Sequence, residues 1–252
     1  MKEINLISQD TINYGVDLGL RHGLETLLKG LVGVKGLHWI RPFYLYPQQV
    51  TDSLLDLYAG EEKITKYIDM PLQHINDRML KRMHRLGDRA AIDKLVNRIR
   101  KRIPGVAFRT AFIVGFPGET EAAFQELKTY ITETEFDRVA VFLYTDEEDT
   151  TALSLDGKID RVLMEERRNE LLAIQEQIAA AKGRDRIGSR MTALVDGPSE
   201  ETPLLLEGRH EGLAPEIDGV VYINDGEARP GDLVTVEVTD AATYDLVGHV
   251  VT

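Results

Sequence analysis

Apolar positions in residues 1–144 follow two alternating periodicities. Short runs that are continuously apolar, or apolar at every second position, are typical of strands. Segments with apolar residues three and four positions apart, such as Leu20, Leu24, Leu27 and Leu31, are typical of helices. Thr51 is a plausible N-cap for one helix. The predicted strands are 3–8, 38–46, 64–70, 106–114 and 138–144, and the predicted helices are 18–31, 51–59, 77–103 and 120–134.

This alternation of strand and helix predicts parallel strands joined by helical crossovers, either in a barrel or in an open doubly wound sheet. In both architectures the functional site lies at the carboxyl ends of the strands. Residue types suited to a site follow the predicted strands. They are Gln9 and Asp10, Tyr46 and Pro47, Gln73 and His74, Gly115 to Glu119, and Tyr144 to Glu147.

The pattern changes after residue 145. Residues 146–160 are acidic and irregular, and residues 161–184 predict a long charged helix with an apolar stripe at Leu171, Ile174 and Ile178. Short strand-like runs separated by turn signals then predict a small closed barrel of the OB type. These runs are 190–195, 203–206, 219–223, 233–238 and 245–251. We therefore expect three regions, 1–160, 161–186 and 187–252.

The amino-acid composition limits the kinds of partner that this chain is expected to bind. The net charge is −12 and the isoelectric point about 5.0, which argues against binding dominated by nucleic-acid phosphates. One basic cluster runs from Lys81 to Arg102, and it is either a solvated helix face or a rim for an acidic partner. No apolar stretch is long enough to span a bilayer, and no secretory signal is present. We expect a cytoplasmic protein without membrane contact.

The sequence contains no cysteine, which excludes disulfides and thiolate-bound metal in this chain. None of the six histidines forms an HxH or HxxxH pair. We therefore predict no metal site within these residues.

Four motifs have both a structural and a functional interpretation. The turn 115–120 joins a strand to a helix and could bind a polar ligand through backbone N–H groups, or could be purely structural. Asp10 could cap a turn, and His74 could be a buried histidine with satisfied hydrogen bonds. Arg109 begins a very apolar strand, so it needs a carboxylate partner, either from the protein or from a ligand.

As a set, several motifs resemble the radical S-adenosylmethionine (SAM) methylthiotransferase family, in particular its RimO branch. That branch adds a methylthio group to an aspartate of small-subunit ribosomal protein twelve. The motifs are 3–11 with Tyr14, Gly15 and Asp17, then 44–47, 71–74, 80–83 with Arg85, and 109–120, with Asp240, Ala241 and 244–246 fitting the branch's TRAM domain.

The resemblance implies a partial radical SAM barrel followed by TRAM, with SAM and two 4Fe–4S clusters as cofactors of the intact enzyme. In the family the cluster cysteines lie upstream of a strand like 3–8, so we expect that this chain starts at the second barrel strand, cannot bind either cluster and is inactive alone. The implied cofactor-binding residues are Gln9, Asp10, Gln73, His74, Arg109, Ile113, Val114 and Gly115.

Within these roles, Arg109 is a candidate partner for the cofactor carboxylate. Residues 113–115 would flank the adenine through backbone contacts. The resemblance also implies a ribosomal protein as partner, bound through an acidic TRAM domain. Two alternatives stay open: a tRNA methylthiotransferase, for which a basic TRAM domain would be expected, and a non-catalytic module that only binds a partner.

Overall fold

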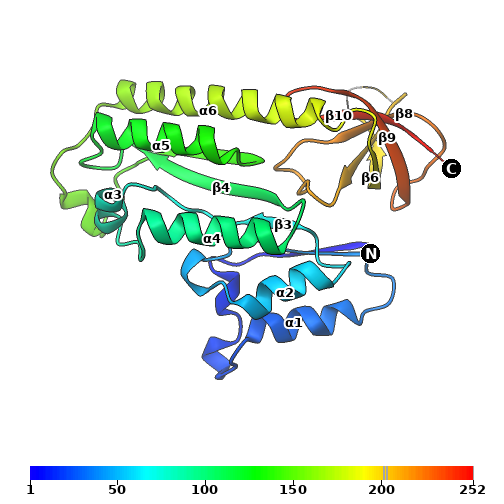
Figure 1. Cartoon of the computed structure of the whole chain (residues 1–252), viewed down its shortest axis with the longest axis horizontal. Helices are drawn as coiled ribbons and strands as arrows, with labels where there is room; N and C mark the ends of the chain where they lie inside the picture. Colours follow the sequence, from blue (N-terminus) through cyan, green and yellow to red (C-terminus); the bar gives the residue numbers. More distant parts are fainter. Residues whose placement is uncertain (201, 203, 252) are drawn as a thin grey trace.

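One long helix joins two strand-rich regions in the computed structural model (Figure 1), which describes residues 1–200, 202 and 204–251. The first region holds five parallel strands and the helices between them. The second is a small barrel built from the C-terminal residues. No helix in the described part of the chain has the length and apolar character needed to cross a bilayer.

The N-terminal strands are short and are connected by helical segments. The helix α2 begins after Thr51, whose hydroxyl accepts a hydrogen bond from the Leu54 N–H at 3.0 Å, so the predicted N-cap is confirmed. The elements are β1 (Glu3–Leu6), α1 (Gly23–Val32), β2 (Trp39–Pro42), α2 (Asp52–Gly60), β3 (Tyr67–Asp69), α3 (Asp77–Arg82), α4 (Arg89–Arg102), β4 (Ala107–Val114), α5 (Glu121–Thr134) and β5 (Arg138–Leu143).

These strands lie side by side in the order of the sequence. β1 pairs with β2, and β3, β4 and β5 form a second parallel set. A parallel bridge between Ile40 and Ile64 joins the two sets. A doubly wound sheet would reverse its strand order part-way. The sequential order therefore selects the partial barrel over the doubly wound alternative.

Alternate residues of each strand face opposite sides of this curved sheet. Ile40, Ile68, Phe108 and Phe112 are completely buried in one core with residues of the surrounding helices. The intervening residues face the concave side. They include Glu3, Arg41, Tyr67, Asp69, Arg109, Arg138 and Phe142.

The prediction of a single helix over 77–103 is wrong, because the chain forms two helices there. α3 ends at Arg82, and α4 starts only after Asp88, whose carboxylate caps it by accepting the Ala91 N–H at 2.8 Å. Between them His84 and Gly87 both have positive φ, which a continuous helix does not allow. Apolar periodicity continues across this break, so spacing alone did not reveal it.

The helix α6 (Arg161–Arg184) packs on β5 and α5 and leads into a closed five-stranded barrel, as predicted. Its second strand starts later than predicted, at Leu206 instead of Pro203, and Pro203 itself lies outside the described residues. The barrel strands are β6 (Arg190–Pro198), β7 (Leu206–His210), β8 (Val221–Asp225), β9 (Leu233–Ala241) and β10 (Leu246–Val250).

The C-terminal barrel sits at the amino ends of the parallel strands, opposite the end to which β4 points in Figure 1. Its β7–β8 segment approaches the first residues of β3 and β4, where Ala214 packs with Phe43, Tyr67 and Ala107. This segment closes the amino end of the partial barrel and leaves the carboxyl ends of the strands free of the C-terminal barrel.

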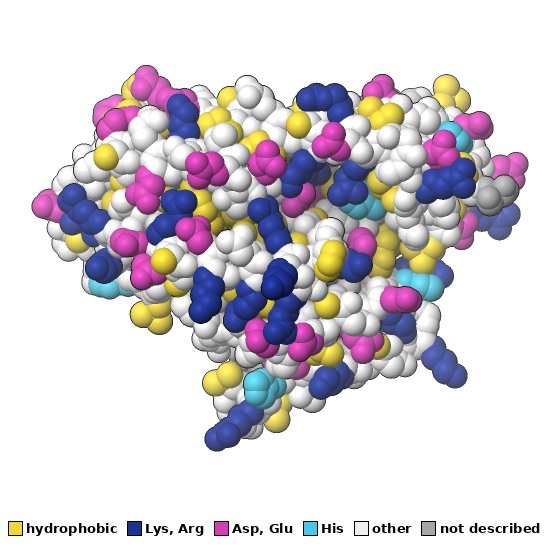
Figure 2. Space-filling view, in the orientation of Figure 1, with side chains coloured by type: hydrophobic (Ala, Val, Ile, Leu, Met, Phe, Trp, Pro, Cys, Tyr) yellow, Lys and Arg dark blue, Asp and Glu magenta, His cyan; other side chains and the backbone are white. Residues whose placement is uncertain are grey.

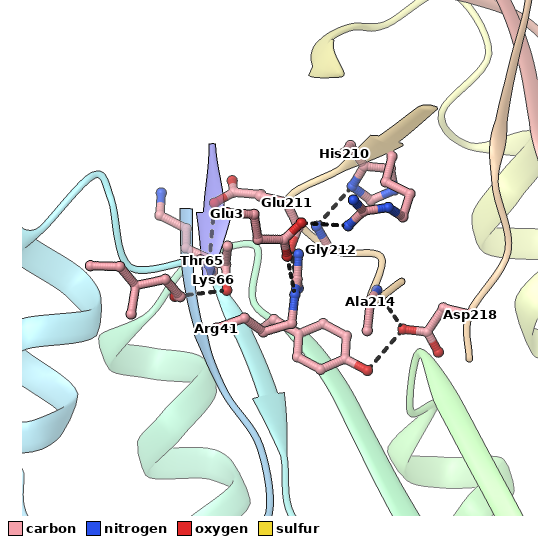
Figure 3. A network of polar contacts seen from close by, with 12 residues as sticks. Glu3, Arg41, Thr65, Lys66, His210, Glu211, Gly212, Ala214 and Asp218 are labelled. Carbon is pink, nitrogen blue, oxygen red and sulfur yellow. Dashed lines mark hydrogen bonds and ion pairs between the residues drawn. The ribbon is translucent and has the colours of Figure 1, made fainter. Parts of the chain in front are cut away.

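A network of buried charges holds the two barrels together (Figure 3). Glu3 accepts hydrogen bonds from Arg41 at 3.0 Å and from Arg209 at 2.6 Å, and Arg209 also forms two 2.8 Å bonds to Asp196. The Arg41 guanidinium donates to the Glu211 carbonyl at 2.7 Å. A buried charge is tolerated only with a close partner, so each member of the network requires the others.

The basic cluster of residues 81–102 is largely paired within the protein. Figure 2 shows Lys and Arg side chains gathered over α4 and α2. Arg102 forms ion pairs with Asp52 and Asp56 of α2, Arg98 also pairs with Asp52, and Arg89 pairs with Asp93. These contacts favour the solvated helix face over a rim for an acidic partner.

The charge network gives a stability prediction. Glu3→Leu should lower the free energy of unfolding by about 3 kcal/mol or more, because it leaves Arg41 buried without a carboxylate and removes one of the two carboxylates that pair with Arg209. Urea denaturation measures this change. Glu237→Leu is the matched control, since its pair with the exposed Arg190 should contribute less than about 1 kcal/mol. Equal effects of the two substitutions would contradict the prediction.

Candidate functional site

The segments that follow the five parallel strands meet in one row at the carboxyl end of the partial barrel. Backbone hydrogen bonds connect neighbouring segments: the Thr11 N–H donates to Tyr44 at 3.2 Å, and the Ile113 N–H donates to Gln73 at 2.8 Å. The Tyr144 N–H donates to Val114 at 2.9 Å. The fold therefore brings the strand-end motifs of the sequence to one rim.

Gln9 and Asp10 follow β1 at this rim. Gln9 is exposed. Asp10 caps the next helical turn, since one carboxylate oxygen accepts the Ile12 N–H at 3.2 Å and the other accepts the Asn13 amide at 2.7 Å. Asp10 therefore caps a turn, as its structural interpretation expected. Contact of Gln9 or Asp10 with a cofactor stays a prediction.

Gln73 and His74 shape the turn after β3. Gln73 has a φ of +68° and joins β4 through its own N–H and carbonyl. The His74 ring is completely buried, and its Nδ1 accepts the N–H groups of Ile75 at 2.8 Å and Asn76 at 3.0 Å. Burial, with a smaller contribution from Arg167, lowers the pKa of His74 to about 4, so the ring is neutral at pH 7.

Arg109 has a protein carboxylate as partner. Its guanidinium donates to Asp69 at 2.7 Å, and the other Asp69 oxygen accepts the Tyr44 N–H at 3.0 Å. Tyr44 adopts a φ of +54°, an uncommon conformation for a side-chain-bearing residue. Arginine carries five N–H donors, so the pair with Asp69 leaves donors for a ligand carboxylate, and that role stays a prediction.

The three residues expected near adenine differ in orientation. Ile113 faces the concave side, whereas Val114 is buried in the core under the helices. Gly115 has a φ of +79°, and a Cβ atom there would lie 2.3 Å from Cγ of Met164 on α6. Glycine is favoured at this turn both by the positive φ and by the close approach of Met164 on α6.

The turn after β4 is held from inside by Glu119, which is buried and accepts the Gly115 N–H. Arg167 of α6 lies 3.6 Å from the Glu119 carboxylate and donates to its backbone carbonyl at 3.3 Å. Burial raises the pKa of Glu119 to about 7, although the Gly115 N–H and Arg167 both act in the opposite direction.

Sequence reasoning missed Asp69 and Arg167 as residues that shape the rim. Asp69 ends a buried strand, which is an unusual place for an unpaired acid, and this was an available signal. Arg167 interrupts the buried stripe of α6 at the spacing of Met164 and Leu171, which marks it as a buried cation. Neither signal identifies the partner.

Family comparisons agree with this architecture. Residues 6–131 match the model of the radical SAM superfamily, and residues 187–251 match the model of the TRAM domain. The chain belongs to the radical SAM superfamily. The partial barrel with its C-terminal TRAM barrel, expected from the motifs, is therefore confirmed.

Relatives match along the whole chain. A protein of Anaeromyxobacter sp. (strain K) named ribosomal protein uS12 methylthiotransferase RimO is 49% identical over 99% of this chain and 53% of its own length. A protein of the same name from Myxococcus xanthus is 47% identical over 100% of this chain and 52% of its own. The resemblance to the RimO branch is thereby confirmed, and the chain spans about half the length of these relatives.

A solved structure shares the fold at low sequence identity. Coproporphyrinogen III oxidase (HemN) from Escherichia coli, described as a radical SAM enzyme, superposes with a TM-score of 0.52 and 16% identity, covering 75% of this chain and 51% of that one.

Radical SAM enzymes use SAM and a 4Fe–4S cluster, and the two groups fit this chain differently. Protein-bound iron–sulfur clusters are held by cysteine thiolates, which this chain lacks. Within the described residues no cluster of three acidic, histidine or cysteine side chains could hold a metal. The rim does suit a nucleoside, because Ile113 and Tyr144 pack with Phe116 in an apolar group beside the Gly115 turn.

The Gly115 turn gives a steric prediction. Gly115→Ala should destabilise the fold by about 2 kcal/mol more than Gly19→Ala, because both have positive φ but only the Cβ at Gly115 meets Met164. Gly19→Ala alone should cost about 1–2 kcal/mol. Thermal or urea unfolding measures both. The additional destabilisation of Gly115→Ala over Gly19→Ala should become smaller when Met164 is also replaced by alanine. If this difference stays the same, Met164 is not its cause.

Glu119 gives a pH prediction. A carboxyl pKa raised from 4.5 to about 7 means that the folded state binds the proton more tightly than the unfolded state. The wild type should therefore lose stability relative to Glu119→Gln as pH rises from about 4.5 to about 7, by about 3 kcal/mol in total. Urea unfolding of both proteins at pH 5 and pH 8 measures the difference, and titration of His74 cancels in it. Parallel pH profiles would refute the assignment.

Proposed function

We propose that this chain supplies the SAM-binding barrel and the TRAM domain of a methylthiotransferase that modifies an aspartate of ribosomal protein uS12. The observation that carries the proposal is the similarity to RimO proteins, which runs through both the rim motifs and the C-terminal barrel. Because these relatives are about twice as long, the activity is proposed for the whole protein.

In this proposal the rim residues bind and orient SAM. Backbone groups of residues 113–115 flank the adenine, and the free donors of Arg109 bind the carboxylate, with Gln9 and Gln73 beside them. Asp10 and His74 act mainly by fixing the turns that carry these groups, as their internal hydrogen bonds indicate. The bound cofactors supply the radical chemistry, and the protein contributes orientation and exclusion of water.

Since the chain has no cysteine, we propose that these 252 residues alone are inactive and serve only to bind a partner. This retains the non-catalytic module as a description of the isolated chain. It does not replace the methylthiotransferase as a description of the whole protein.

The charge of the TRAM domain favours a protein substrate over tRNA. Residues 187–252 contain no lysine and three arginines, Arg190, Arg209 and Arg229. Arg209 is buried between Glu3 and Asp196, and Arg190 pairs with Glu237. One arginine then remains for phosphates, whereas tight nucleic-acid binding needs several cations. An acidic surface complements a basic ribosomal protein.

A segment exchange tests the proposal. The Anaeromyxobacter RimO protein with its matching half replaced by this chain should add one methylthio group to uS12, seen by mass spectrometry as modification of a single aspartate. The 252-residue chain treated with iron and sulfide should show no 4Fe–4S absorption and should leave uS12 unmodified.

Modification of tRNA, but not of uS12, by the exchanged protein would select the tRNA alternative. An exchanged protein that folds and binds its cluster but modifies neither substrate would overturn the proposed activity. Cluster assembly on the isolated chain would refute its predicted inactivity.

A further inference from the structure

The last parallel strand has an open edge. In the described part of the chain, β5 has β4 as its only strand neighbour. The Tyr144 N–H points to β4, and by strand alternation the N–H and C=O groups of Val139, Val141 and Leu143 point to the opposite side. An edge of this kind is a template for another extended chain.

A groove runs beside this edge. The start of β5 lines it from one side with Arg138, Val139 and Ala140, together with Arg109 of β4, and the TRAM barrel lines it from the other with Ile217, Gly219 and Tyr244. Arg138 closes the groove at its amino end by donating to the Tyr244 carbonyl at 3.2 Å. The groove therefore lies between the TRAM barrel and the first half of β5.

Two exposed apolar residues lie in this region. Ile217 on the TRAM side is 51% exposed, and Phe142 near the rim is 57% exposed on the concave face. Strand β5 has six residues, so its open edge is about 20 Å long, which matches an extended segment of similar length. An isolated exposed apolar residue needs no explanation, but Ile217 in the groove and Phe142 on the strand with the open edge together indicate a binding surface.

The charge of the residues at the rim end indicates which kind of partner would bind along this edge. Glu147, Glu148 and Asp149 follow β5, are exposed, and have no ion-pair partner among the residues that the structure describes. Asp146 beside them pairs with Lys158. Three free carboxylates attract a basic peptide and repel the phosphates of a nucleic acid.

We propose that the open edge of β5, from Ile217 to Phe142, is the docking surface for an extended basic segment of the protein partner, which adds to the sheet as a further strand. Main-chain hydrogen bonds would provide affinity, and Phe142 and the 147–149 carboxylates would provide specificity. The inference rests on the proposed function in taking this partner to be the substrate protein. It explains how a TRAM domain at the amino ends of the strands can guide a substrate to the carboxyl ends.

Binding of overlapping synthetic uS12 peptides to the 252-residue chain tests the surface. One basic peptide should bind, and it should slow hydrogen exchange at the amides of Val139, Val141 and Leu143. Methylation of alternate backbone nitrogens in that peptide should weaken binding at least tenfold with an unchanged protein, which avoids any question of misfolding. Phe142→Asp should also weaken it by about tenfold or more.

Val34→Asp in the loop before β2 is the matched control, because Val34 is 43% exposed and β3 and β4 lie between β2 and β5, and it should leave binding unchanged. Absence of peptide binding, or binding that protects amides elsewhere and ignores Phe142→Asp, would overturn the docking surface. The segment-exchanged enzyme separates the two proposals: if it modifies uS12 equally well with Phe142→Asp, the surface is wrong and the proposed function stands.

Discussion

The contact of Glu3 with Arg41 and Arg209 determines how the two barrels are arranged. Each of these side chains is almost completely removed from water, and burial of a charge is unfavourable by several kcal/mol unless a partner compensates it. Glu3 and Arg41 come from the first two strands, and Arg209 comes from the TRAM barrel. Glu3 pairs with Arg41 inside the sheet and Arg209 pairs with Asp196 inside the TRAM barrel, and the 2.6 Å contact of Glu3 with Arg209 joins these two pairs when the TRAM barrel sits at the amino ends of the strands.

This arrangement separates the two ends of the partial barrel. The amino end is filled by the β7–β8 segment, where Asp218 accepts the Tyr67 hydroxyl at 2.8 Å. The carboxyl end carries the polar turns, including the positive-φ residues Tyr44, Gln73 and Gly115. These three turns hold uncommon backbone conformations at the end left open, as is found where a fold binds its ligand.

Local chemistry made much of this fold predictable. Apolar spacing and the Thr51 cap act over a few residues, so strands and helices were placed within a few positions of their actual bounds. The break between α3 and α4 was missed because its cause, two positive-φ residues, leaves no mark on apolar spacing. The site was predictable as a row of strand ends, but its contacts were not. Whether Arg109 binds protein or ligand depends on Asp69, which is forty positions away in the sequence. Arg167 contacts Glu119 across 48 positions.

The helix α6 has a consequence for how this architecture can change. Its first turns contact the rim turn through Met164 and Arg167, and near its end a Cβ at Gly183 would lie 3.3 Å from Ala241 of β9. With 24 residues, it is a rigid spacer of about 36 Å that connects the rim to the TRAM barrel. A single inserted residue would turn one end against the other by about 100°. The number of residues in α6 is therefore constrained by its contacts at both ends, more tightly than the lengths of the loops are.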